Sequence, residues 1–238
     1  VGLDKFKELF AGAQFGYAFR NTVYMALLNL TLGFIIPVIL GLLISQVRNK
    51  RTSRVVQTTT YMPYFVAPVV VCTLAKEFLK EGGAITMFLT MFGLPNQNWL
   101  AVNSPVFWFI NCFLGIWQGA GYGAIVYIAA INGIDQNLYE AACIDGASRW
   151  QRLWNITIPS IVSLVVMMFT MQIGLVFMTG FDKVLLLYMP TTYEFSDCLS
   201  TYTYRMAFSA GNDFSLSTAS GLLQSIIGTL LLIFGNKM

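Results

Sequence analysis

Apolar residues fill five long stretches of the chain, and polar or charged residues gather in the segments between them. An α-helix needs about 20 mostly apolar residues to cross the hydrocarbon core of a membrane. The stretches are close to that length and cover residues 22–47, 55–75, 105–131, 161–181 and 216–234. The pattern predicts an all-α membrane protein, a polytopic helical bundle in which residues 1–238 form a single transmembrane domain.

Two of the stretches carry residues that indicate close packing between helices. The second begins with polar residues and contains Pro63 and Pro68, so we expect it to be kinked and packed inside the bundle. The third contains glycines, which let neighbouring helices approach closely. These are Gly115, Gly119, Gly121 and Gly123.

Composition excludes a water-soluble domain. Hydrophobic residues make up 56% of the 238 residues and charged residues 11%, whereas an average globular chain is about 25% charged. The basic residues also orient the bundle. The segment that follows the first stretch contains Arg48, Lys50, Arg51 and Arg54 and no acid, which places it in the cytoplasm by the positive-inside rule.

Successive segments between spans lie on opposite sides of the membrane, which places segment 132–160 in the cytoplasm and the N-terminus outside. Because an outside N-terminus needs an export signal and residues 1–20 lack one, we expect a further helix before residue 1. The net charge of +3 comes largely from the single basic segment. It therefore indicates topology, and no nucleic-acid partner is expected.

Residue types exclude several kinds of chemistry. The chain has no His and no GxxxxGK[ST] phosphate loop, so no metal site and no ATP site of its own are expected. The predicted spans contain no Asp, Glu, Lys or Arg. This argues against a proton-coupled secondary transporter and against an intramembrane enzyme with paired carboxylates. An ATP-independent transporter or channel remains the alternative function.

Segment 132–160 is too long and too amphipathic for a simple turn. Residues 140–144 favour a helix, Asp145 and Gly146 break it, and Ser148 can cap a second helix. We expect that helix to end before Pro159, which starts the next span. Its apolar residues form one stripe: Trp150, Leu153, Trp154 and Ile158. Such an element is typical of a docking surface for a membrane or a partner.

The same segment resembles the EAA motif of binding-protein-dependent ABC transporter permeases. The residues that match the motif at its spacing are Glu140, Ala141, Ala142, Asp145, Gly146, Ala147 and Pro159. Collinear flanking residues are similar to the complex-carbohydrate branch of that family: 21–22, 57, 61–65, 202–205 and 221–222. Val162 departs from the pattern, because many relatives have a second Pro there.

The resemblance implies a permease of the type I ABC importer kind, with five spans in this sequence and 132–160 as a cytoplasmic coupling-helix loop. In that family the loop binds a groove of a separate ATPase subunit. Contact with the ATPase is therefore expected from Glu140, Ala141, Ala142, Asp145, Gly146, Ala147, Arg149 and Trp150. ATP and Mg would bind to the partner ATPase. The chain itself would bind no cofactor and would not be an enzyme.

The implied partners are a second permease subunit, two ATP-binding subunits, an extracytoplasmic solute-binding protein and membrane lipid, in a bacterial or archaeal plasma membrane. The implied substrate is a carbohydrate, more narrowly an oligosaccharide, with a non-sugar solute as the alternative. Amides can bond sugar hydroxyls, and aromatic rings can stack on sugar C–H faces. Candidates for the substrate path are therefore Asn111, Trp117, Gln118, Tyr122 and Gln172. Polar side chains within spans can equally serve to hold helices together.

The stretch from residue 184 to residue 215 is long for a loop and apolar in its first part. We expect it to be structured outside the membrane and partly re-entrant. It could contact a solute-binding protein, and a purely structural role is the alternative.

Overall fold

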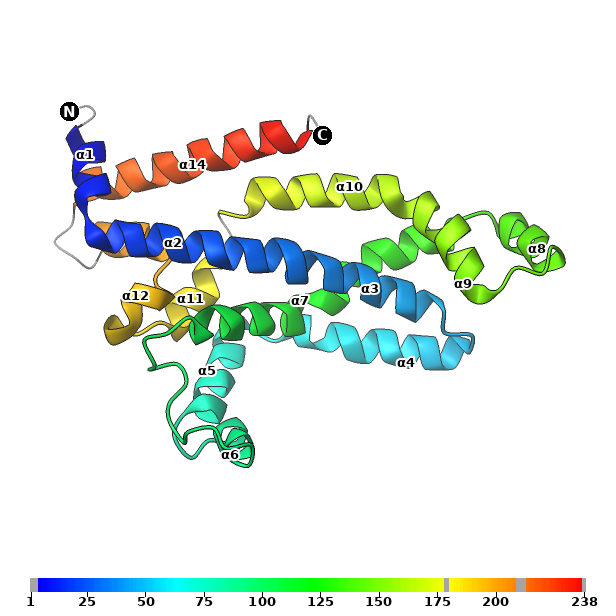
Figure 1. The fold of residues 1–238 in the computed structure, drawn as a ribbon, viewed down its shortest axis with the longest axis horizontal. Helices are drawn as coiled ribbons and strands as arrows, with labels where there is room; N and C mark the ends of the chain where they lie inside the picture. The colour runs from blue at the N-terminus through cyan, green and yellow to red at the C-terminus, as the bar shows by residue number, and fades with distance from the viewer. Residues whose placement is uncertain (1–3, 178–179, 209–212, 237–238) are drawn as a thin grey trace. The chain divides into compact units, whose positions relative to one another are not determined.

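The computed structural model describes residues 4–177, 180–208 and 213–236, and these residues form helices joined by turns, without strands (Figure 1). By length and composition, the helical runs able to cross a membrane are Ala13–Ser45, Val106–Asn132, Arg149–Leu175 and Phe214–Gly235. A bent pair, Lys50–Phe65 followed by Pro68–Thr90, adds a further candidate. The predicted all-α, multi-pass architecture is confirmed.

The chain divides into two compact units. Unit 1 comprises residues 1–31, 66–114 and 173–238, and unit 2 comprises residues 32–65 and 115–172. The prediction that residues 1–238 act as a single domain stays a prediction.

The helices of unit 1 range in length from the four residues of α12 to the 23 residues of α14. They are α1 (Asp4–Ala11), α2 (Ala13–Leu28), α5 (Pro68–Leu79), α6 (Ala84–Thr90), the start of α7 (Val106–Asn132), α11 (Phe181–Leu187), α12 (Tyr193–Ser196), α13 (Leu199–Phe208) and α14 (Phe214–Asn236).

Unit 2 contains the remaining helices. They are α3 (Phe34–Ser45), α4 (Lys50–Tyr61), most of α7, α8 (Gln136–Ile144), α9 (Arg149–Arg152) and most of α10 (Ile158–Leu175). A 3₁₀ turn, Met62–Phe65, follows α4, and π-helical turns at Asn29–Gly33 and Leu153–Thr157 precede α3 and α10.

Three helical runs begin before the spans predicted from the sequence. The run that contains the first span begins at Ala13, ahead of the predicted start at Thr22. Residues 13–21 carry one charge, on Arg20, whose Nη2 donates to the Glu194 carbonyl oxygen at 2.6 Å. The helical run that contains the fourth span extends from Arg149 to Leu175, whereas the predicted span was 161–181, of which residues 178–179 lie outside the described part of the chain.

The second span also begins and ends outside the predicted limits of 55–75. Asn49 caps α4, its Oδ1 accepting from Arg51 N at 2.9 Å, so the basic residues from Lys50 onward lie on a helix and not in a loop. The predicted interruption at the prolines is confirmed, because α4 ends at Tyr61, a 3₁₀ turn that contains Pro63 follows, and α5 starts at Pro68. The third and fifth spans agree with the prediction to within two residues.

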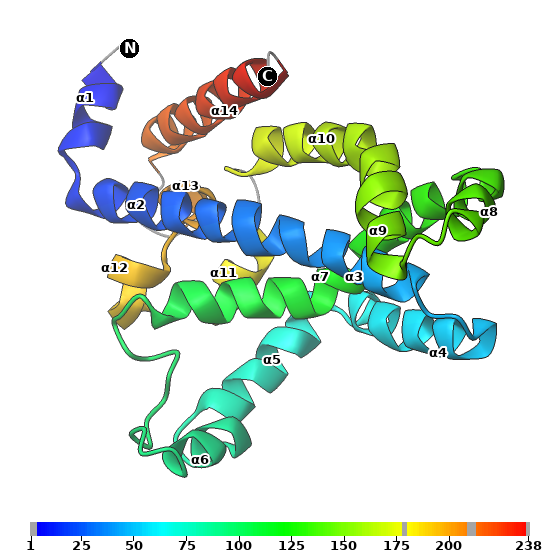
Figure 2. The same cartoon turned by 45° about the vertical axis from the view of Figure 1, so that its right-hand side comes forward.

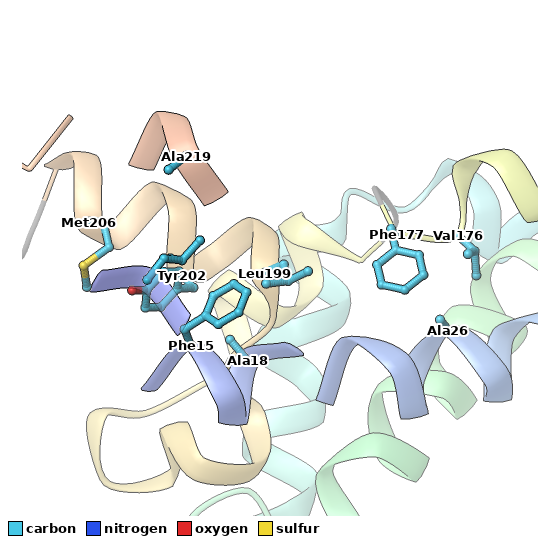
Figure 3. Packing of buried hydrophobic residues seen from close by; sticks show 10 residues of the cluster. Phe15, Ala18, Ala26, Val176, Phe177, Leu199, Tyr202, Met206 and Ala219 are labelled. Atoms are coloured by element: carbon cyan, nitrogen blue, oxygen red, sulfur yellow. The ribbon is translucent and has the colours of Figure 1, made fainter. Parts of the chain in front are cut away.

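One of the buried hydrophobic clusters of unit 1 forms where α2 packs against α13. Figure 3 shows Phe15 and Ala18 of α2 facing Leu199 and Tyr202 of α13. The rings of Phe15 and Tyr202 meet edge to face with their centroids 6.0 Å apart. The side chain of Asn21 is fully buried, and its Nδ2 donates to the carbonyl oxygens of Glu194 and Asp197 at 3.0 and 2.9 Å. The described part of the predicted outer stretch is therefore folded; residues 209–212 lie outside it.

A buried ion pair stabilises the same region. Arg205 Nη2 lies 2.5 Å from Asp197 Oδ2, and the side chains are only 9% and 2% exposed. Thr201 Oγ1 donates to the other carboxylate oxygen at 2.7 Å, and the guanidinium carbon of Arg205 lies 4.4 Å from the centre of the Tyr193 ring. Burial raises the pKa of Asp197, while the Thr201 hydrogen bond and the Arg205 charge oppose that rise.

Unit 2 is held together by close helix approaches at glycine. A Cβ at Gly121 would collide with the backbone oxygen of Thr60 on α4, and one at Gly41 would lie 2.9 Å from Cβ of Tyr127. Gly123 faces Pro37. The prediction that glycines permit close packing is confirmed at Gly121 and Gly123, whereas Gly119 faces open space.

Candidate functional site

The predicted cytoplasmic loop folds into two helices within unit 2. Asp135 Oδ1 accepts from Asn137 N at 2.9 Å and so caps the start of α8. Because this cap starts the helix at Gln136, α8 is longer than the predicted 140–144 and carries Glu140, Ala141 and Ala142 in its second half.

A tight turn of defined type ends α8. Gly146 has φ +76°, Ala147 N donates to the Ala142 carbonyl oxygen at 2.9 Å, and Gly146 N donates to that of Cys143 at 3.1 Å. These two bonds form a Schellman motif, which satisfies the last carbonyls of the helix and favours glycine at its left-handed position. An added Cβ at Gly146 would meet no atom within 4 Å. Backbone conformation, and not space, therefore requires glycine here.

The second helix starts at a capping box. Gln151 N donates to Ser148 Oγ at 3.3 Å, and Ser148 N donates to Gln151 Oε1 at 2.7 Å. The predicted cap at Ser148 is confirmed. The prediction that a separate short helix ends before Pro159 is wrong, because α9 continues through the π-helical turn into α10. The N–H of Ile158 bonds to Leu153 O, and Pro159 follows where the helix changes its hydrogen-bond pattern.

Side-chain bonds connect the two helices of the loop to the base of the following span. Tyr139 on α8 hydrogen-bonds through its hydroxyl to Thr157 Oγ1 at 2.8 Å, and Thr157 is fully buried. Arg152 Nη1 donates to Cys143 Sγ at 3.4 Å. Figure 2 shows α8 and α9 beside each other. The loop and the first turns of the span therefore form one connected piece.

The outer surface of this piece is exposed and partly apolar. Glu140, Asp145 and Arg149 are exposed, and large apolar side chains stand beside them: Ile144, Trp150 and Trp154 are 87%, 70% and 63% exposed. An uncovered apolar surface rimmed by charges is typical of a protein or membrane contact. The eight predicted contact residues all lie on this loop.

The substrate-path candidates divide between the two units. Asn111 belongs to unit 1, is buried, and donates from Nδ2 to Met25 Sδ at 3.5 Å. Its Oδ1 is buried without a hydrogen-bond partner and lies beside a cavity of about 10 Å³, roughly the size of one water molecule.

The other candidates belong to unit 2. Gln118 is buried, Gln172 is half-buried, and Trp117 is 47% exposed. Tyr122 is 45% exposed and stacks on Tyr64, with ring centroids 3.9 Å apart. Tyr64 was not among the predicted path residues. The only feature of the sequence that pointed to it is its place in the run 61–65. The assignment of these residues to a substrate path stays a prediction.

The described residues offer no ready metal site. No group of three or more Cys, Asp or Glu side chains in the described ranges could hold a metal ion. The exposed groups of the loop suit it to make contacts: the carboxylates of Glu140 and Asp145, the guanidinium of Arg149 and the indole rings of Trp150 and Trp154.

Known proteins match this arrangement over nearly its whole length. A family model described as "Binding-protein-dependent transport system inner membrane component" matches residues 33–236. The chain is 36% identical to the polygalacturonan/rhamnogalacturonan transport system permease protein YteP of Bacillus subtilis (strain 168), over 100% of this chain and 74% of that protein. It is 30% identical to the sn-glycerol-3-phosphate transport system permease protein UgpA of Pectobacterium atrosepticum, over 98% and 76%.

A solved structure has the same fold. A chain in the crystal structure of a bacterial alginate ABC transporter, in complex with an alginate pentasaccharide-bound periplasmic protein, superposes with a TM-score of 0.94. The two chains are 37% identical, and the match covers 100% of this chain and 82% of that one. The similarity confirms the predicted fold class and the resemblance carried by the EAA motif.

Proposed function

The chain belongs to the family of binding-protein-dependent transport system inner membrane components, and we propose that it is the permease subunit of an ATP-driven oligosaccharide importer. The family is one of transport components and not of enzymes. The observation that carries the proposal is the loop at 132–160, a rigid two-helix element with an exposed apolar surface that is joined without a break to a membrane-spanning helix.

The loop is suited to transmit movement. Since α9 continues into α10 and Tyr139 bonds to Thr157, a force on the turn at Gly146 would move α8, α9 and α10 together. In the proposed mechanism a separate ATPase subunit binds this surface, and its ATP-driven closure shifts the spans between inward-open and outward-open states. The contact residues would be Glu140, Ala141, Ala142, Asp145, Gly146, Ala147, Arg149 and Trp150, with ATP and Mg held by the partner.

The proposed assembly contains a second permease, two ATP-binding subunits and an extracytoplasmic solute-binding protein, in a bacterial plasma membrane. The alginate transporter structure supports the binding protein, because its own complex contains a periplasmic protein with a bound pentasaccharide. The permease named for polygalacturonan transport supports an oligosaccharide substrate. The permease named for sn-glycerol-3-phosphate keeps a non-sugar solute as the alternative.

Two variants at Gly146 test the docking step. Gly146→Trp would place a large ring on the docking surface. In Gly146→Asn, the asparagine can adopt the positive φ of this position and adds only a small side chain to the surface. The full-length protein and its variants are purified in mild detergent, copurifying proteins are identified by mass, and ATPase activity is assayed. We expect the wild type and the Asn variant to capture an ATPase and the Trp variant to lose it. A folded wild-type sample without any ATPase would overturn the proposal.

The substrate class needs a separate measurement. Binding-protein-dependent uptake is followed in vesicles with a labelled oligogalacturonide and with labelled glycerol-3-phosphate. Uptake of the first and not the second supports the oligosaccharide assignment. The reverse result would establish the non-sugar alternative and leave the docking proposal intact.

A further inference from the structure

A polar cavity lies in unit 2 where the cytoplasmic ends of its helices meet. It has a volume of about 440 Å³ and is bounded by the end of α3, the end of α7, α8 and α9. Three arginines line it, together with amide side chains that can also donate hydrogen bonds: Arg48, Arg149, Arg152, Gln46, Asn132 and Gln136.

No carboxylate pairs with the arginines of this cavity within unit 2. Unit 2 is described in full, and its cavity lining contains no Asp or Glu. None of the ion pairs in the described residues involves Arg48, Arg149 or Arg152. The Nε of Arg152 is buried without a hydrogen-bond partner. Clustered guanidinium groups without counter-charges are typical of phosphate and carboxylate binding.

An apolar groove continues from the polar cavity. Its volume is about 420 Å³, and it shares Gln46, Arg149 and Leu153 with the cavity. The rest of its lining is almost wholly apolar: Ile39, Leu42, Leu43 and Trp150. Leu43 is 60% exposed, so the groove offers an uncovered hydrocarbon surface. A phospholipid has a phosphate headgroup and apolar acyl chains. The arginine-lined cavity matches the headgroup, and the groove matches an acyl chain.

We propose that the cavity and the groove together bind one anionic phospholipid. The phosphate headgroup lies against the three arginines, and one acyl chain follows α3 past Leu43 and Leu42. The depth fits, because the positive-inside rule places Arg48 at the cytoplasmic surface, where anionic headgroups gather. A soluble phosphate would use the cavity and leave the groove empty. The bound lipid connects α3 to α9, next to the coupling loop.

Paired charge-removal variants test this site. The purified full-length protein is titrated with phosphatidylglycerol and with phosphatidylcholine, and bound lipid is counted by native mass spectrometry. Arg48→Gln with Arg152→Gln removes two charges from the cavity. Arg51→Gln with Arg54→Gln removes two exposed charges from α4, in the same unit and outside the cavity. Arg149 stays unchanged because it also belongs to the proposed ATPase contact.

We expect phosphatidylglycerol to bind in preference to phosphatidylcholine, and its affinity to fall at least about 10-fold in the cavity variant and less than about 2-fold in the α4 variant. Equal losses in both variants would show general charge attraction and overturn the proposal. If the double variant loses its cooperative unfolding transition, Arg48→Gln alone replaces it, since that side chain is exposed.

The groove and the headgroup source are tested in the same assay. Leu43→Asn is expected to weaken phosphatidylglycerol binding, and millimolar glycerol phosphate is expected not to displace the lipid. Displacement by glycerol phosphate, with no effect of Leu43→Asn, would assign the cavity to a soluble anion and contradict the lipid site. None of these measurements depends on the ATPase, so their failure is distinct from failure of the proposed function.

Discussion

Two helical regions of this chain differ in whether they bury or expose their polar and aromatic side chains. In unit 1, helices α12 and α13 bury Asp197 and Arg205 against each other and fix Asn21 through two backbone oxygens. In unit 2, the coupling loop leaves Trp150 and Trp154 more than half exposed. The first region buries its charged side chains within itself, and the second leaves large apolar side chains uncovered.

The contrast shows that rigidity and closure are separate properties. The coupling loop is internally stiff, because the Schellman turn and the capping box fix α8 and α9 in place. Its side chains nevertheless remain available to a partner. A loop that transmits force needs this combination, since a flexible loop would absorb the movement and a closed one would offer no contact.

The largest expected effect comes from breaking the buried ion pair. Arg205→Met would leave the Asp197 carboxylate buried without its counter-charge, and we expect a loss of about 3–5 kcal/mol in unfolding free energy. The control is Lys80→Met, which breaks a pair of the same 2.5 Å length whose side chains are 53% and 58% exposed; we expect less than about 1 kcal/mol there. Thermal unfolding in detergent measures both, and equal losses would contradict the distinction between the regions.

A smaller effect is expected where α7 meets α4. Gly121→Ala would push a methyl group into the backbone of Thr60, and we expect a cost of about 1–3 kcal/mol. Gly119→Ala is the matched control, because that position on the same helix faces open space. It should be neutral or stabilising by up to about 1 kcal/mol. The same unfolding assay measures both variants. Equal changes in unfolding free energy for Gly121→Ala and Gly119→Ala would contradict the close approach of α7 to α4.

The turn of the coupling loop should tolerate substitution better than the packed helices do. Gly146→Ala forces an L-residue into a positive φ and should cost about 1–2 kcal/mol. Gly146→Asn should cost less, because Asn adopts this region more readily. Amide hydrogen exchange of Gly146 and Ala147 would show the strain locally. Faster exchange throughout unit 1 in either variant would show that the loop is not the independent element described above.

The smallest effect concerns acid stability at the start of α14. Asp213 Oδ1 accepts from Leu216 N at 3.0 Å, and Lys5 Nζ lies 3.0 Å from Oδ2; the backbone bond first and the lysine second hold the pKa of Asp213 below its usual value. A lowered folded pKa stabilises the protein above the unfolded value of about 3.9, and this contribution is lost as pH falls through the folded pKa.

We therefore expect a slight fall of the unfolding temperature below about pH 4 that is weaker in Asp213→Asn. Unfolding temperatures recorded between pH 3 and pH 6 test this. Identical profiles for the two proteins would show that the cap contributes nothing to acid sensitivity.

Local features of the chain could be predicted from the sequence, and long-range ones could not. The break at Gly146 and the cap at Ser148 depend on hydrogen bonds between residues at most five positions apart, so the sequence is enough to predict them. The pairing of Tyr64 with Tyr122 and the anchoring of Asn21 on residues more than 170 positions away depend on tertiary packing. Only a three-dimensional structure could reveal them.

One error has a clear physical cause. Pro159 was expected to separate a short helix from a span, but a π-helical turn ahead of it lets the helix continue. Likewise, the positive-inside rule explained Arg48 as a marker of topology, and its place beside Arg149 and Arg152 in one cavity emerged only from the fold.

The docking of an ATPase on the coupling loop is tested most directly by a cysteine that the native chain already carries. Cys143 lies on α8 and is exposed, whereas Cys72, Cys112 and Cys198 are buried. Maleimide labelling of Cys143 is followed by mass spectrometry in the assembled transporter and after removal of the ATPase. We expect labelling to be at least about 10-fold slower in the assembly, because the docked subunit covers α8. Equal labelling rates in the two samples would contradict the claim that this loop is the ATPase contact.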